Sequence, residues 1–64
     1  MNAAERGIPE RIHMVGIGGI SLSAIARILA AWGCRVSGSD LRATPVTRGL
    51  NALGIRTFEG HRAE

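Results

Sequence analysis

The stretch from Ile12 to Ala26 reads IHMVGIGGISLSAIA, and the rest of the chain is organised around it. An apolar run stops at a cluster of glycines, and apolar residues then recur at helical spacing. This order predicts a strand, a tight turn and the start of a helix. Backbone N–H groups at the start of a helix lack intrahelical partners, and the helix dipole gives them partial positive charge. Because glycine has no Cβ to keep a phosphate away from the main chain, we expect a pyrophosphate site at this turn.

The glycines follow an incomplete dinucleotide-binding fingerprint, G-x-G-x-x-G. Gly16 and Gly18 occupy its first two glycine positions, but Ser21 occupies the third. The strand before the turn and the helix after it are the context that such a site needs. The alternative is a plain strand-to-helix turn in which the glycines only allow close packing.

Composition limits the class of protein. The chain has 64 residues and a formal net charge of +3, which leaves room for one small domain or part of one. Its basic residues are all arginines and are spread along the chain, so no nucleic-acid partner is expected. No apolar run approaches the roughly 20 residues of a membrane span, and the N-terminus lacks an apolar signal segment. We therefore expect a cytoplasmic protein without a membrane partner. The lone Cys34 excludes an intrachain disulfide and a multi-cysteine metal site.

The hydrophobic periodicity predicts five elements. Residues 1–10 are expected to form a flexible lead-in, because Gly7 and Pro9 would break a helix, and residues 11–64 the folded part. The expected elements are a strand at 11–15, a helix at 20–32, a strand at 34–37, a helix at 44–53 and a strand at 55–58. The apolar stripe of the first helix is expected to face the core and comprises Ile20, Ala24, Ile25, Ile28, Leu29 and Trp32.

The βαβαβ order predicts an α/β fold. We expect a Rossmann-like half of a three-layer domain, with parallel strands in the spatial order 3-2-1. Strand tips near Gly16, Asp40 and Gly60 then share the edge where open α/β sheets bind ligands. The exposed third strand offers a route to self-association.

Polar residues near this edge are candidate ligand contacts. Asp40 follows the fingerprint at the spacing where, in dinucleotide sites, a carboxylate holds a ribose hydroxyl. The alternative is a loop aspartate that bonds to its own backbone. Ser21 and Ser23 lie in the first turn of the helix and would either satisfy free N–H groups or bind a phosphate oxygen. His13 is either a structural strand histidine or a functional one, and the sequence leaves this open.

Two separated segments resemble the Mur ligase family. They are Val15 to Ile20, with Ser23, Ile25 and Ala26 following, and the VSGSD segment at residues 36–40. The usual family wording is GIGGIGMSGIA and then VSGSD, and this chain departs from it at Ser21, Leu22 and Ala24. The likeness covers about residues 11–62 and is greatest to the branch that attaches L-alanine to UDP-N-acetylmuramate.

The resemblance implies a substrate-holding role. Mur ligases build peptidoglycan precursors by joining an amino acid to a nucleotide-linked muramic acid with ATP, and their N-terminal domain holds the UDP end of the substrate. The implied partners are UDP-N-acetylmuramate and the remainder of the ligase. The UDP or pyrophosphate contacts would be Gly16, Ile17, Gly18, Gly19, Ile20, Ser21, Ser23, Ser39, Asp40 and His61.

The resemblance does not extend to the residues that would carry out the ligase chemistry. The sequence holds no G-x-x-x-x-G-K-[ST] phosphate loop, so we expect no catalytic residue, no metal site and no cofactor in this chain. ATP and Mg²⁺ would belong to other domains of the parent enzyme. One alternative is an NAD(P)-binding half-domain of an oxidoreductase, in which Asp40 favours NAD and Arg42 would accept a 2′-phosphate. Another is a non-catalytic interaction module that completes its sheet with a partner or a second copy.

Overall fold

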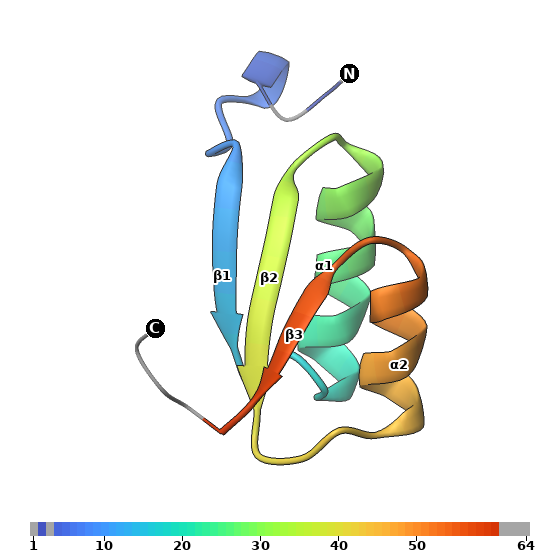
Figure 1. Cartoon of the computed structure of the whole chain (residues 1–64). Helices are drawn as coiled ribbons and strands as arrows, with labels where there is room; N and C mark the ends of the chain where they lie inside the picture. Colours follow the sequence, from blue (N-terminus) through green and yellow to red (C-terminus); the bar gives the residue numbers. More distant parts are fainter. Residues whose placement is uncertain (1, 3, 61–64) are drawn as a thin grey trace.

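From the first strand onward the order of elements along the chain is the predicted one, and a short 3₁₀ helix that was not predicted precedes it. The computed structural model describes Asn2 and residues 4–60, so the candidate contact His61 lies outside the described residues. The elements are η1 (Ala4–Arg6), β1 (Arg11–Val15), α1 (Ile20–Ala31), β2 (Arg35–Asp40), α2 (Pro45–Ala52) and β3 (Arg56–Glu59) (Figure 1).

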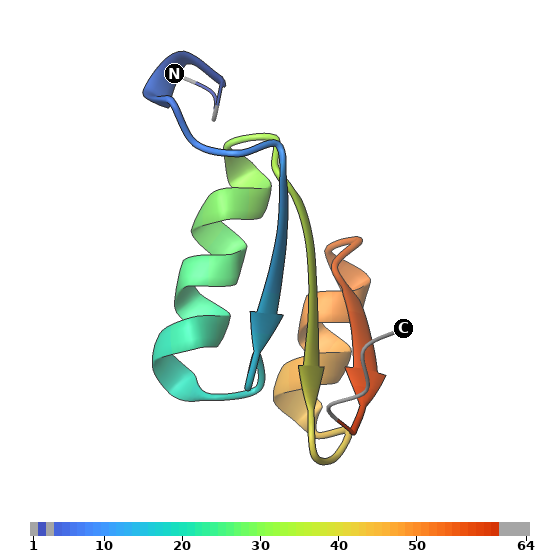
Figure 2. The ribbon, with the colours of Figure 1, turned by 90° about the vertical axis from the view of Figure 1, so that its left-hand side faces the viewer.

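The three strands form one parallel sheet in the order β1-β2-β3, which confirms the expected topology. Both helices lie on the same face of this sheet (Figures 1 and 2). The described residues therefore form the sheet and one helical layer of the expected α/β architecture. Parallel sheets are normally covered on both faces. In the described chain no helix covers the second face, and Val15 on it is 62% exposed.

The core lies between the sheet and the two helices. Its fully buried large side chains are Ile17, from the glycine turn, and Leu50, from α2. Leu50 lies on the side of α2 that packs into the core, and α2 is held at its start by a capping box. Thr44 accepts from the backbone N–H of Thr47, and the Thr47 hydroxyl accepts from the backbone N–H of Thr44.

The predicted buried stripe of α1 is only partly confirmed: Leu29 and Trp32 are partly buried and pack against the core, but its other members are exposed, namely Ile20, Ala24, Ile25 and Ile28. Ile20 is 90% exposed and Ile28 is 49% exposed, whereas the buried residues of the helix are Ser23 and Ala26. The helix is apolar almost all round, with Arg27 its only charged residue, so helical spacing alone does not tell its two apolar sides apart. The structure puts the small residues against the sheet, where the helix packs closely.

β2 extends three residues further than its apolar run predicted. The sequence suggested a strand at 34–37, but the observed strand continues through Gly38 and Ser39 to Asp40. Val15 pairs with Ser39 on one side, and Glu59 pairs with Asp40 on the other. Both ladders thus continue through these residues, which overrides the weak strand preference of glycine and aspartate.

The described part of the lead-in contacts the end of the sheet and of α1. The backbone N–H of Arg35 donates to the carbonyl of Glu10 at 2.7 Å. The guanidinium of Arg6 lies 4.0 Å from the centre of the Trp32 ring. The flexibility of this segment stays a prediction.

Candidate functional site

The glycine turn is tied to the tip of β2 by its backbone. The N–H groups of Gly16 and Ile17 donate to the carbonyl of Ser39, at 2.7 and 3.1 Å. Gly19 then donates to the carbonyl of Gly16 at 3.0 Å. Gly16 has φ of +81°, a conformation open to glycine at no steric cost. The turn therefore has its own hydrogen-bond partners and does not depend on a ligand for them.

Asp40 adds a side-chain tether to the same turn. The N–H of Gly18 donates to Asp40 Oδ2 at 2.7 Å, and the N–H of Leu41 donates to Asp40 Oδ1 at 2.7 Å. The carboxylate thus faces the glycine turn and its own loop. A Cβ on Gly18 would lie 2.6 Å from Asp40 Oδ2, so only glycine leaves room for this contact. The structure brings together the two motifs that the sequence showed separately.

The N-terminus of α1 opens beside this tether. Its N-cap is Gly19, which supplies no side-chain hydrogen bond. Among the described residues, the N–H groups of Ile20, Ser21 and Leu22 have no partner, and the first satisfied amide of the helix is that of Ser23, which donates to Gly19. Three adjacent N–H groups at a helix start, with the dipole behind them, are the arrangement that commonly binds anions in proteins. The side chains of Ile20 and Ser21 are exposed and do not cover it.

Three of the predicted contacts have buried side chains. Ile17 is fully buried, Ser39 is 2% exposed, and Ser23 is 7% exposed with its hydroxyl donating to the carbonyl of Ile20 at 3.1 Å. The hydroxyl of Ser23 is therefore engaged by a carbonyl of its own helix and, among the described residues, accepts from no free N–H group, so it does not take the role stated above as the structural alternative. A role for these three residues in binding stays a prediction.

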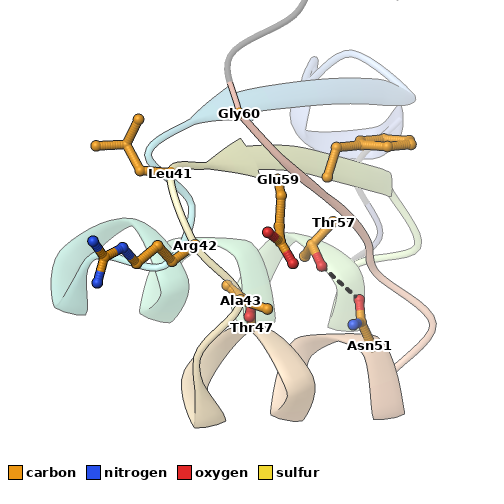
Figure 3. Close-up of a pocket in the computed structure, with 9 residues that line it drawn as sticks. Leu41, Arg42, Ala43, Thr47, Asn51, Thr57, Glu59 and Gly60 are labelled. Carbon is orange, nitrogen blue, oxygen red and sulfur yellow. Dashed lines mark hydrogen bonds between the residues drawn. The ribbon is translucent and has the colours of Figure 1, made fainter.

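A pocket of about 740 Å³ adjoins the site at the carboxyl ends of β2 and β3. Thr57 and Glu59 of β3 point toward Thr47 and Asn51 of α2, and the Thr57 hydroxyl donates to Asn51 Oδ1 at 2.9 Å (Figure 3). Thr47 joins the pocket to the glycine turn, because its Cγ2 lies 3.2 Å from where a Cβ on Gly18 would be.

Sequence reasoning missed this pocket. The capping pattern from Thr44 to Thr47 marked a helix start, and nothing in it indicated that Thr47 also lines a cavity.

His13 lies on the face of the sheet that the helices leave open. Its Nδ1 is 2.9 Å from the hydroxyl of Ser37, its direct neighbour on β2. Asp40 is bonded to the turn before α1, on the helix side of the sheet. The histidine is therefore not part of the cluster formed by the glycine turn and the tip of β2.

In residues 4–60 no three His, Cys, Asp or Glu side chains gather in an arrangement that could hold a metal ion. No helix in the described part of the chain has the length and apolar character to cross a bilayer.

Comparison with known proteins gives consistent matches. The profile described as "Mur ligase family, catalytic domain" matches residues 11–64. A protein named UDP-N-acetylmuramate–L-alanine ligase from Koribacter versatilis is 57% identical over 54 residues, which cover 84% of this chain and 12% of the relative. A protein of the same name from a Synechococcus strain is 60% identical over 52 residues, which cover 81% of this chain and 11% of the relative. Another, from a Jannaschia strain, is 51% identical over 67 residues, which cover 100% of this chain and 14% of the relative. The chain thus spans about an eighth of the length of these relatives.

Proposed function

We propose, from the premise that this chain belongs to the Mur ligase family, that it holds the diphosphate of a UDP-linked substrate. The substrate class follows from the relatives, which are named for UDP-N-acetylmuramate. The chain would serve as the substrate-holding, N-terminal portion of a cytoplasmic ligase that makes peptidoglycan precursors.

One observation carries the proposal. Within the described part of the chain, the N–H groups of Ile20, Ser21 and Leu22 have no partner at the start of α1, whereas the amides of the preceding turn are engaged. A diphosphate supplies acceptor oxygens for such donors and negative charge for the dipole. A charge-assisted hydrogen bond is about twice as strong as a neutral one, so three donors would give a useful affinity.

The pocket supports the proposal, because it offers space for a nucleoside beside the proposed diphosphate site. It opens at the carboxyl ends of β2 and β3, where parallel α/β sheets bind ligands. Thr47 is shared by the pocket and the surroundings of Gly18, so a ligand held at the start of α1 would reach the pocket along the loop at residues 41–43. We assign the uridine to this pocket.

The ligase reaction itself is assigned to other parts of a complete enzyme. The sequence contains no phosphate-loop motif, so we propose that ATP and Mg²⁺ bind outside these residues and that the chain contributes no catalytic group. Its role would be to orient one substrate for the chemistry of the other domains.

Ligand preference tests the proposal. Isothermal titration of the 64-residue chain should give tighter binding for UDP-N-acetylmuramate or UDP than for NAD or NADP. Preferential binding of NAD would instead favour an oxidoreductase half-domain, and a preference for NADP would point to Arg42 as a 2′-phosphate partner.

A further inference from the structure

We infer that Asp40 is a positioning residue that holds the glycine turn in shape, and not the group that grips the sugar of the ligand. This inference rests on the proposed function for its binding readout. Its structural content concerns the free protein and is testable without any ligand.

Both oxygens of the Asp40 carboxylate face the backbone of the chain. Oδ2 accepts from the N–H of Gly18 and Oδ1 accepts from the N–H of Leu41, each at 2.7 Å. In dinucleotide sites the carboxylate at this place instead faces the hydroxyls of a ribose. Here each oxygen already accepts a backbone N–H, and the carboxylate is only part-buried, so its orientation is set by the chain itself.

The contact between Gly18 and Asp40 completes a set of bonds that ties the glycine turn to β2. Gly16 and Ile17 are tied to the carbonyl of Ser39, and Gly18 is tied to the next residue, Asp40. Three successive amides of the turn thus depend on two successive residues of β2. These bonds hold the turn in place just before Ile20, where the amides without a partner among the described residues begin. The N–H of Gly18 is therefore used in the fold, and the N–H groups at the start of α1 are the ones that we assign to the ligand.

The space around Gly18 leaves no room for a side chain. A Cβ there would lie 2.6 Å from Asp40 Oδ2 and 3.2 Å from Thr47 Cγ2. The Gly18 position is therefore shaped to admit the carboxylate, which an alanine would displace. Gly18→Ala and Asp40→Ala break the same contact from opposite sides, so their effects should not add.

The first test measures the free protein. In ¹⁵N-edited NMR spectra, Asp40→Ala should move the Gly18 amide proton upfield and raise its hydrogen-exchange rate about tenfold or more, the scale of a lost charge-assisted hydrogen bond. Asp40→Asn keeps an acceptor oxygen and should retain most of the protection. Glu10→Gln, which removes one carboxylate from the chain away from the turn, is the control and should leave Gly18 unchanged. Equal protection of Gly18 in wild type and Asp40→Ala would overturn the inference.

The second test separates positioning from sugar binding. Titrations with UDP and with inorganic pyrophosphate, which has no ribose, should both weaken in Asp40→Ala relative to Asp40→Asn, by a similar factor of about tenfold. Comparing two neutral variants removes the effect of the lost charge on an anionic ligand. The double variant Gly18→Ala/Asp40→Ala should bind UDP no worse than the weaker single variant.

The contrary outcomes are distinct. Weaker UDP binding with unchanged pyrophosphate binding would make Asp40 a sugar contact and overturn the inference. Failure of the wild type to bind either ligand would refute the proposed function, while the Gly18 exchange comparison would still decide the role of Asp40.

Discussion

Ile17 lies directly over Gly38, at a distance that leaves no room for a side chain on β2. A Cβ on Gly38 would fall 2.5 Å from Ile17 Cδ1 and 2.7 Å from the carbonyl oxygen of Met14. Ile17 is fully buried and belongs to the glycine turn, so this contact seats the turn on the sheet. The same residues that shape the candidate site therefore also complete the core.

We expect Gly38→Ala to destabilise the fold by about 1–3 kcal/mol, the usual penalty for forcing extra volume into a packed core. Urea unfolding followed by circular dichroism measures the change. Gly49→Ala is the matched control, because its Cβ would meet only the flexible end of Arg27, at 3.3 Å, and alanine is the better helix former. The control should be neutral or stabilising. Equal stabilities for the two variants would contradict the close contact of Ile17 with Gly38.

Thr44→Ala should lower the free energy of unfolding by about 0.5–2 kcal/mol. Thr44 accepts from the N–H of Thr47 and caps α2, and removing a cap of this kind has that effect. Thr44→Ser keeps the hydroxyl and should retain most of the stability in the same unfolding experiment. A serine variant as unstable as the alanine variant would show that the methyl group of Thr44, not the cap, is what matters.

The sequence predicts the structure correctly where local sequence signals and the fold agree. β1 was predicted with its observed bounds, because an apolar run ended at glycines with a helix behind them. The N-cap of α2 at Thr44 was visible in the Thr-Pro pair. The parallel topology followed from the order of elements, and it is confirmed.

The failures concern contacts between distant segments. The exposed face of α1 was misassigned because the choice between its apolar sides depends on how closely Ala26 approaches the sheet. For Asp40 the alternative of a bond to its own loop is confirmed at Oδ1, which accepts from the N–H of Leu41, but no local signal indicated that Oδ2 would reach Gly18, 22 residues away in the chain. The pocket was missed for the same reason, since its walls come from α2 and β3 and from the loop between β2 and α2.

The isolated chain should be marginally stable or self-associated. Exposed apolar side chains remain on the uncovered sheet face and on α1, among them Val15, Phe58 and Ile28, and β3 has an open edge. Sedimentation equilibrium combined with a thermal melt tests this. A monomer with a cooperative melt above roughly 70 °C, beyond the usual range for mesophilic domains, would contradict the expectation.

Ser21→Gly should change UDP affinity by less than about threefold, or about 0.6 kcal/mol, which is below the roughly 1 kcal/mol that a typical net hydrogen bond contributes. The side chain of Ser21 is exposed, and the backbone N–H that we assign to the ligand is present in both residues. Titration of UDP into both proteins gives the ratio. A loss of tenfold or more in the glycine variant would make the Ser21 hydroxyl a direct ligand.

The most direct test of diphosphate binding at the start of α1 is to delete one of its amides. Ile20 is the first residue of the helix and 90% exposed, and Gly19 before it has φ of −67° and ψ of 151°, which suits a residue preceding proline. Ile20→Pro therefore removes one N–H donor without disturbing the fold, and Ile20→Ala removes the same side chain but keeps the N–H. We predict equal melting of the two variants and UDP binding at least about tenfold weaker for Ile20→Pro than for Ile20→Ala. Equal UDP affinity of two equally folded variants would contradict the proposed site.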